Sequence, residues 1–286
     1  MNIRDSQNFL HNKKLVKDLV EQSNITNQDI VLEIGPGKGI ITKELLPVCK
    51  EVYAIEFDEE LFDKLKNDLK EQKNLHLIND DFLLYDLPKD TYKVFSNIPF
   101  NITADILSKL LMNDNSPSDM YLIMQYEAVL KYAGEPYYSD SLKSLMFKPQ
   151  YEIKIVHEFN ATDFAPVPKV SIVLAHFHKK EWCDVKKATM KDWWDFLSYV
   201  YTAQGKFIKE KTKKIFSYEQ QKRLRKSLHI EEDVSISCWT YAQWIGLFNC
   251  YIQLVCAEKK SQVIGAYERL LKQQEKIEKV HRNRKK

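Results

Sequence analysis

The stretch Ile30-Val31-Leu32-Glu33-Ile34-Gly35-Pro36-Gly37-Lys38-Gly39 decides the fold class of this chain. Its first five residues are typical of a short buried strand, and Ile41 and Leu45 beyond it predict a helix. Three of the chain's seven glycines fall within the five residues of the intervening turn, which indicates a demanding backbone. A strand, a glycine turn and a helix in this order form the first unit of a nucleotide-binding α/β sheet.

Six more short apolar runs predict further strands, at 52–55, 75–78, 92–95, 120–124, 153–156 and 170–174. Helical patterns separate several of them, above all the apolar stripe on 61–69 and the segment 102–112. Alternating strands and helices favour an α/β fold with a parallel, Rossmann-like sheet. Ligands of such sheets bind outside the carboxyl ends of the strands.

Polar side chains stand where these strands end. Glu56 ends the second strand, 17 residues beyond Gly39, which is near the spacing at which an acid binds ribose hydroxyls. Asp81 follows the third strand and Asn97 the fourth. Because the carboxyl ends of parallel strands meet at one edge of the sheet, we expect the glycine loop and these side chains to surround one site.

The sequence Ser96-Asn97-Ile98-Pro99-Phe100 suits methyl transfer to an exocyclic amino group of a base. The lone pair of that nitrogen is delocalised into the ring, and the Asn97 side-chain carbonyl with the Ile98 backbone carbonyl would localise it toward the incoming methyl. Pro99 fixes φ, and Phe100 offers a face for a flipped base and for the positive charge that develops on nitrogen. An ordinary Asn-x-Pro turn after a strand is the alternative.

The glycine loop is shared by dehydrogenases and methyltransferases, so it leaves the cofactor open. Its spacing is G-x-G-x-G rather than G-x-G-x-x-G, and no second nucleotide-binding half follows. Glu33 before the loop and Asp81 after the third strand suit a cofactor with an amino-acid end and an adenine. S-adenosyl-L-methionine has both, and it supplies the methyl group that the Asn97 site would use.

After His178 the pattern is helical, and we place a domain boundary near residue 180, between a cofactor-binding catalytic domain (1–180) and a small all-helical domain (181–286). The tryptophans of 193–244 lie on helical stripes and are predicted to be core rather than base-stacking platforms. Net charge is only +3, but nine Lys or Arg occur within 206–226 and six within 276–286. Such local charge indicates a polyanion partner, although a solvated helix face gives the same pattern.

Composition is that of a globular chain, with 286 residues, 44% hydrophobic and 29% charged. No signal-peptide pattern and no apolar span of membrane length is present, so we expect a soluble cytoplasmic protein with no membrane partner. Five cysteines without a Cys-x-x-Cys pair favour incidental thiols in a reducing compartment. The histidines, among them His176 and His178, lack the usual metal-ligand spacing, so we predict no metal.

Taken together, the motifs resemble those of the rRNA adenine N6-dimethyltransferases over the first 180 residues. The matching segments, in order, are Gln7-Asn8-Phe9-Leu10, Glu33 to Gly39, Glu56, Asp81, Asn97 to Phe100, and Pro166-x-Pro168-Lys169-Val170. Asn-Ile-Pro-Phe is similar to the Erm branch, which acts on 23S rRNA, whereas the KsgA branch, which acts on 16S rRNA, more often has Asn-Leu-Pro-Tyr. The segments 224–228 and 243–248 also resemble the longer Erm enzymes.

The resemblance implies cofactor contacts for a set of residues that close over S-adenosyl-L-methionine, carry its methionine end, or bind its ribose and adenine: Asn8, Leu10, Glu33, Gly35, Gly37, Gly39, Glu56, Asp81, Phe82 and Asn97. It also implies a catalytic segment Asn97-Ile98-Pro99-Phe100, with Phe100 stacked on the target adenine and Phe164 on its other side. The implied activity is N6-methylation, once or twice, of one adenine in protein-free or assembling 23S rRNA. Its consequence is resistance to macrolide, lincosamide and streptogramin B antibiotics.

Two departures from the family pattern concern the RNA side of the site. Lys169-Val170 is followed by Ser171-Ile172 without the family's acidic residue, and 126–132 lacks the family's arginines. The exact target therefore stays open, and a KsgA-like 16S rRNA enzyme shares every catalytic residue. An RNA-binding or assembly factor that has lost catalysis, and a nicotinamide dehydrogenase, are the remaining alternatives. The Asn-Ile-Pro-Phe segment has no role in hydride transfer.

Overall fold

The computed structural model describes residues 9–283, without the side chains of 275 and 277–283. The chain divides into two compact units: the sheet unit, Met1–Leu130 with Tyr151–Lys179, and the helical unit, Lys131–Gln150 with Lys180–Lys286. One crossing between the units falls at the predicted position near residue 180. The sequence gives no sign of the other two crossings, which assign 131–150 to the helical unit.

Within residues 9–283 the sheet unit has one seven-stranded sheet and a separate two-stranded pairing. The seven-stranded sheet has the order β4 (Leu75–Asn79), β3 (Glu51–Glu56), β2 (Ile30–Ile34), β5 (Lys93–Asn97), β6 (Asp119–Gln125), β9 (Ile172–Lys179) and β7 (Tyr151–Glu158). The small pairing joins β1 (Phe9–Leu10) to β8 (Phe164–Ala165). Every strand predicted from the sequence is present. The five strands from β4 to β6 are parallel as expected, whereas β9 and β7 are antiparallel additions.

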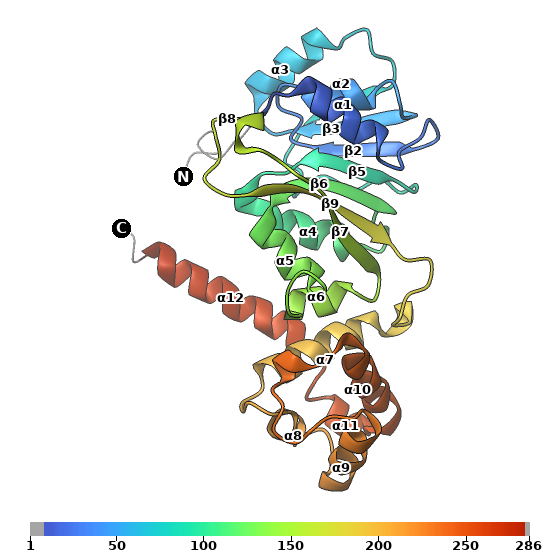
Figure 1. Ribbon diagram of the computed structural model, residues 1–286, viewed down its shortest axis with the longest axis vertical. Coiled ribbons are helices and arrows are strands. Elements are labelled where there is room, and N and C mark those ends of the chain that lie inside the picture. Colours follow the sequence, from blue (N-terminus) through green and yellow to red (C-terminus); the bar gives the residue numbers. More distant parts are fainter. Residues whose placement is uncertain (1–8, 284–286) are drawn as a thin grey trace. The chain divides into compact units, whose positions relative to one another are not determined.

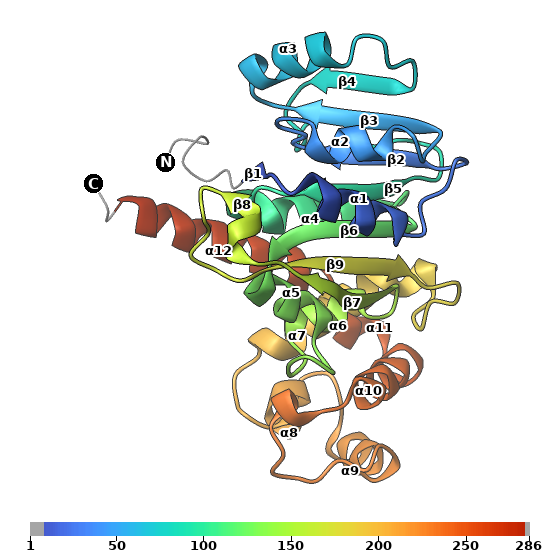
Figure 2. The ribbon, with the colours of Figure 1, turned by 45° about the horizontal axis from the view of Figure 1, so that its top comes forward.

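Helices cover both faces of the sheet, and Figure 2 draws α1 and α2 before it and α4 behind it. The helices of this unit are α1 (Lys13–Glu21), α2 (Ile40–Leu45), α3 (Glu59–Asp68), α4 (Thr103–Leu111) and the start of α5 (Tyr126–Ala133). Alternate strand residues such as Val31, Val52 and Phe95 meet the apolar stripes of α1 and α2 in one core cluster. The central parallel strands β2, β5 and β6 are buried on both faces, as parallel strands require.

The strand order reverses between β2 and β5. From β2 the chain moves outward to β3 and β4, and then returns to add β5 and β6 on the other side (Figure 1). The β2–β5 ladder pairs Val31 with Lys93 and Leu32 with Val94. Beyond it the buried Ser96 hydroxyl donates to the Ile34 carbonyl (2.6 Å) and accepts from the Ile34 N–H (3.2 Å). A side chain therefore joins the two strands where they separate, at the position where such sheets bind ligands.

The helical unit consists of α6 (Leu142–Phe147), α7 (Met190–Thr202), α8 (Ile208–Thr212), α9 (Tyr218–Ser227), α10 (Tyr241–Leu254), α11 (Ala257–Lys260) and α12 (Ala266–Asn283). Trp193, Trp239 and Trp244 are buried, which confirms their predicted core role. The Trp193 indole N–H donates to the Leu145 carbonyl (2.9 Å). This bond explains why 131–150 belongs here, because it joins α6 to α7. No helix of the described residues has the length and apolarity to cross a bilayer.

Candidate active site

One cavity lies at the carboxyl ends of β2, β3 and β5, where the strand order reverses. Most of the predicted site residues line it: Leu10, Glu33, Gly35, Gly37, Glu56, Asp81, Phe82, Asn97, Ile98, Pro99 and Phe100. Gly39 and Phe164 are not among its lining residues. Asn8 lies outside the described residues. The structure therefore brings together, from segments far apart in the sequence, the side chains whose convergence at this edge we predicted.

The glycine loop joins β2 to α2 through three residues with positive φ. A Cβ on Gly37 would lie 3.0 Å from the Phe9 ring, and one on Gly39 would lie 2.3 Å from Leu65 Cδ1. Gly37 therefore lets β1 approach the loop, whereas Gly39 lets α2 begin against α3. Gly39 acts behind the loop in packing rather than at the cavity wall.

Glu56 is buried at the end of β3 and joins the loop to the next helix. Its Oε2 accepts from the Gly37 N–H and its Oε1 from the Asp58 N–H, both at 2.9 Å. Burial raises the pKa of the Glu56 carboxyl, against the lowering effect of these two hydrogen bonds. The carboxylate is thus fixed in orientation at the cavity wall before any ligand binds.

Glu33 is a second buried acid, in β2 beside the glycine loop. The Thr42 hydroxyl donates to its Oε2 at 2.6 Å. Burial, with a smaller contribution from the neighbouring Glu56 charge, raises the pKa of Glu33 to about 8. Among the described residues no cation offsets this burial, so Glu33 is mostly protonated at neutral pH.

The Asp81 and Phe82 segment forms the wall after β4. Asp81 Oδ1 accepts from the Leu83 N–H at 2.8 Å, and the Phe82 ring is buried. The Lys109 ammonium on α4 donates to the carbonyls of Leu83 (2.9 Å) and Tyr85, and it lies 5.3 Å from the centre of the Phe82 ring. Lys109 therefore ties this wall to the helix that follows the Asn97 segment.

The Asn97 segment leaves β5 directly into the cavity. The Ile98 N–H donates to the Ile123 carbonyl of β6 at 3.2 Å, and the buried Ile98 side chain anchors the turn. Pro99 precedes a single 3-10 turn at Phe100–Ile102, and Thr103 donates back to the Pro99 and Phe100 carbonyls. Phe100 is half-buried and lines the cavity. This rigid turn holds an amide and an aromatic ring together at the cavity.

The β1 segment closes one side of the cavity through Phe9 and Leu10. Leu10 pairs with Phe164 and Phe9 with Ala165, and the Lys38 ammonium lies 4.8 Å from the centre of the Phe9 ring. Phe164 itself is 1% exposed and packs edge-on against Phe159. Its ring belongs to the hydrophobic core and does not line the cavity, so the predicted contact with a target adenine stays a prediction.

A comparison with known families identifies the chain at the level of the family. The model that describes ribosomal RNA adenine dimethylases matches residues 1–253. The chain belongs to this family.

Curated relatives from the dimethylase family match this chain over most of their length. An rRNA adenine N-6-methyltransferase of Bacteroides fragilis is 30% identical over 251 residues, which are 87% of this chain and 92% of the relative. One of Bacillus anthracis is 30% identical over 253 residues, 88% of each chain. The chain is therefore an rRNA adenine methyltransferase, and its methyl donor is S-adenosyl-L-methionine.

Solved structures share the fold of this methyltransferase. The crystal structure of the 23S rRNA methyltransferase ErmE superposes with a TM-score of 0.77 at 24% identity, covering 86% of this chain and 100% of that one. A dimethyladenosine transferase from Plasmodium falciparum gives a TM-score of 0.71 at 21% identity, covering 86% and 98%. At these identities the likeness establishes the α/β methyltransferase fold with its helical C-terminal part.

The cavity of this methyltransferase has the chemistry that its methyl donor requires. S-adenosyl-L-methionine carries a sulfonium and an ammonium group, and the cavity presents two buried acids, Glu33 and Glu56. It also offers apolar surface from Phe57 and Phe82 beside Asp81 for a purine. The residues present therefore fit the cofactor.

Several residues that shape this site carry no signal in the sequence. Ser96 and Lys109 act through backbone carbonyls of distant segments, which no local pattern reveals. Phe57 and Phe9 line the cavity beside predicted residues. Phe9 belongs to the matching segment Gln7-Asn8-Phe9-Leu10 but was given no role, and the hint for Phe57 was its position next to Glu56.

Proposed function

We propose that this methyltransferase methylates N6 of one adenine in 23S rRNA, once or twice, and thereby confers resistance to macrolide, lincosamide and streptogramin B antibiotics. The convergence of Asn97-Ile98-Pro99-Phe100 with the acid-lined cavity carries the proposal. The choice of 23S rRNA rests on the resemblance of Asn-Ile-Pro-Phe to the Erm branch.

In this proposal the cavity is divided between cofactor and base. Glu56 accepts hydrogen bonds from the ribose hydroxyls, and the glycine loop with Glu33 holds the methionine end. Asp81 accepts from the adenine amino group, and Phe57 and Phe82 enclose the adenine ring. Leu10 covers the cofactor from β1. When bound, the cofactor supplies an electrophilic methyl group.

The Asn97 segment positions the target nitrogen. The Asn97 and Ile98 carbonyls accept the two N–H hydrogens of the target amino group, which localises its lone pair in the direction of the methyl donor. Phe100 stacks on the flipped base, and its π-face favours the positive charge that develops on nitrogen. No general base is needed in the transfer step, because the proton leaves only after the nitrogen has become cationic.

The helical unit is proposed to hold the RNA. Seven basic residues of 206–226 are exposed: Lys206, Lys209, Lys213, Lys214, Lys222, Arg223 and Lys226. The other two are not available, because Lys211 donates to the Tyr201 and Ala203 carbonyls and Arg225 pairs with Glu232 at 3.1 Å. If the exposed set contacts phosphates, RNA affinity falls steeply with salt, since each phosphate contact releases counterions.

The deciding experiment is methyl transfer from labelled S-adenosyl-L-methionine to protein-free 23S rRNA and, in parallel, to 30S particles. Primer extension then maps the modified base. We expect a single stop in the 23S rRNA and, in cells that express the protein, raised resistance to macrolides. Label confined to 30S particles would overturn the 23S assignment in favour of a KsgA-like activity on 16S rRNA.

A catalytically inactive variant provides the matched control. Asn97→Ala should give no stop in either RNA while it retains cofactor binding. If the wild-type protein binds both cofactor and RNA but labels neither substrate, the chain is an RNA-binding factor on the same fold.

A further inference from the structure

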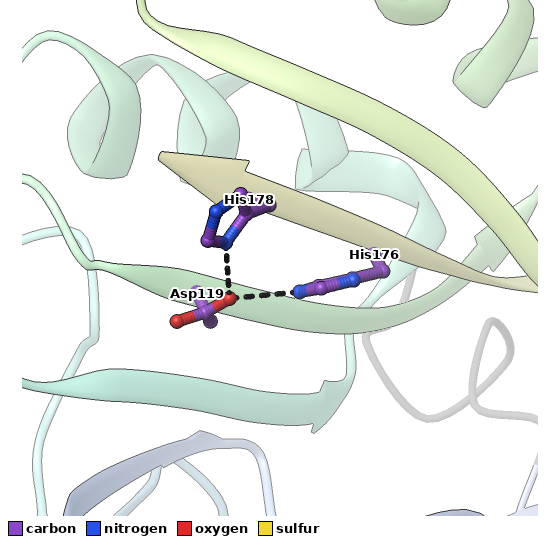
Figure 3. A group of neighbouring side chains, drawn as sticks. All are labelled: Asp119, His176 and His178. Carbon is purple, nitrogen blue, oxygen red and sulfur yellow. Dashed lines mark hydrogen bonds and ion pairs between the residues drawn. The ribbon is translucent and has the colours of Figure 1, made fainter. Parts of the chain in front are cut away.

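Asp119, His176 and His178 form a polar cluster at the opposite end of β6 from the active site (Figure 3). His176 Nε2 lies 2.9 Å and His178 Nδ1 2.8 Å from the same oxygen, Asp119 Oδ1. In the register of the sheet, Asn97 pairs with Ile123 of β6, and Asp119 lies four residues before Ile123. At about 3.3 Å per residue the cluster is roughly 13 Å from the Asn97 position along the strand.

The strand geometry explains how these three side chains meet. His176 and His178 are two residues apart on β9, and successive side chains of a strand alternate between faces, so both rings lie on one face. Asp119 pairs directly with His178, and His176 with Tyr121. The sequence analysis considered the spacing of the histidines without their strand: on a strand, a His-x-His pair places two imidazoles on the same face.

We propose that Asp119, His176 and His178 form a binding site for a divalent transition-metal cation of the zinc class. One carboxylate and two imidazoles are a donor set that zinc accepts with a water as the fourth ligand. Their donor atoms lie within 4.8 Å of one another. Ligand atoms of a tetrahedral zinc site with bonds of 2.0–2.1 Å are about 3.3–3.4 Å apart, so small side-chain rotations convert the observed cluster to that geometry.

The surroundings hold the ligands in place and leave access for the cation. The Asn24 side-chain amide donates to Asp119 Oδ1 at 2.9 Å, and the Tyr121 ring stacks on His176 at 4.2 Å between ring centres. The Asp119 side chain is 5% exposed, whereas that of His178 is 47% exposed. A cation can therefore approach from the His178 side, where water completes its coordination.

Proton movements on binding are simple. Without the metal, each imidazole donates an N–H to Asp119. When the metal binds, the ring changes to its other tautomer, so that the nitrogen facing Asp119 carries a lone pair for the metal. A neutral imidazole needs to release no net proton for this change. The neighbouring Lys93 ammonium does not occupy the site, because it is bound to Asp29 Oδ2 (3.0 Å) and to the Asn24 carbonyl.

The test is metal binding by the untagged full chain, measured with Zn²⁺ by calorimetry and with Co²⁺ by visible absorption. We expect the cluster to bind one equivalent of Zn²⁺ saturably. With Co²⁺ we expect the intense visible absorption bands of a four-coordinate ion. His178→Gln should weaken Zn²⁺ binding by at least about tenfold and remove those bands. Because His178 is partly exposed, this variant is expected to fold.

His157→Gln is the matched control, because His157 lies on β7 outside the cluster. It should bind Zn²⁺ as the wild type does, and Zn²⁺ should raise the Tm of the wild type and of this control but not of His178→Gln. Exposed cysteines bind zinc weakly in all three proteins alike, so the comparison isolates the cluster. Equal Zn²⁺ affinity in His178→Gln and the wild type would overturn the proposal, as would the absence of saturable binding in the wild type.

Discussion

Buried carboxyl groups stand at both edges of the sheet, and their ionisation differs. At the carboxyl edge, burial raises the pKa values of Glu33 and Glu56. At the amino edge burial also opposes ionisation of Asp119, but hydrogen bonds from His176, His178 and Asn24 outweigh it and hold its pKa well below the usual range. The comparison separates two acids whose burial outweighs their hydrogen bonds from an acid whose hydrogen bonds outweigh its burial.

The difference has a functional meaning. An acid with a raised pKa gains most from a ligand that brings positive charge, and the methyl donor of this family is such a ligand. Asp119 remains ionised throughout the neutral range among imidazoles, which suits a metal cation instead. Chemistry is therefore expected only at the carboxyl edge, and the amino edge is expected to affect stability.

The strongest test that chemistry takes place at the carboxyl edge is the variant Asn97→Ala. If the Asn97 carbonyl accepts from the target amino group only as charge develops, its loss should lower kcat by about 10²- to 10³-fold, the size seen when one aligned hydrogen-bonding group of an active site is removed. Cofactor affinity should change much less. Single-turnover transfer of labelled methyl groups measures the rate, with Asn101→Ala, an exposed amide of the same cavity, as the control. Near-normal turnover of Asn97→Ala would remove the proposed mechanism.

Phe100→Ala should give the next largest effect. Loss of base stacking costs about 1 to 3 kcal/mol, which corresponds to roughly 5- to 150-fold in kcat/KM for RNA. Because Phe100 is half-buried, a melting curve is needed to check that the variant is folded. Phe57→Ala, at the cofactor side of the cavity, is the informative partner, since it should raise KM for the cofactor and leave that for RNA unchanged. If Phe100→Ala and Phe57→Ala changed the KM for RNA and the KM for the cofactor equally, the two rings would not serve separate ligands.

The elements that local patterns determine were predicted from the sequence. Short apolar runs and the glycine turn placed the seven strands of the main sheet, though not the small β1–β8 pairing, and the strand ends placed Glu56, Asp81 and Asn97 at one edge. The antiparallel β7 and β9 and the assignment of 131–150 to the helical unit were not predicted. Strand direction and the Trp193 bond to Leu145 depend on partners far away in the sequence, and hydrophobic periodicity carries no information about them.

Side-chain environments were the least predictable part. The family resemblance implied that Phe164 flanks the target adenine, whereas in the structure its ring is part of the core. The sequence did not show that Asp119 lies beside His176 and His178, because this neighbourhood depends on the register of β6 and β9. In both cases the deciding information was the pairing of two strands, which fixes the face and the neighbour of each side chain.

The pH dependence of cofactor binding tests the raised pKa of Glu33 at the carboxyl edge. Its pKa of about 8 in the free protein means that a proton must leave when a cation binds beside it. Affinity for S-adenosyl-L-methionine should therefore rise between pH 6 and pH 8, by at most about tenfold per pH unit. Glu33→Gln, which keeps an acceptor for the Thr42 hydroxyl, should abolish this slope in a calorimetric titration. A slope that survives in Glu33→Gln would assign the proton to another group.

Glu33 also predicts the stability of the cofactor-free protein. Because its folded-state pKa lies above its unfolded value of about 4.5, the folded chain holds a proton that the unfolded chain releases. This contribution is fully present below pH 4.5 and is lost as the pH rises through about 8. The melting temperature of Glu33→Gln relative to wild type should therefore increase from pH 6 to pH 8. A constant difference in Tm over this range would contradict the raised pKa.

Lys109→Met is expected to give the smallest effect and tests whether the carboxyl edge is pre-formed. Lys109 holds the Leu83 and Tyr85 carbonyls, and with them the orientation of the Asp81 segment. Burial lowers the pKa of Lys109 against the raising effect of Asp86, Asp81 and Asp80. Loss of Lys109 should raise the KM for the cofactor about threefold to tenfold, because the Asp81 wall of the cavity is loosened. It should leave kcat unchanged, because the hydrogen bond from the Ile98 N–H to β6 still holds the Asn97 turn. Lys109→Arg should restore part of the affinity, and Lys64→Met on exposed α3 surface should have no effect. A fall in kcat with KM unchanged would place Lys109 in support of the Asn97 turn instead.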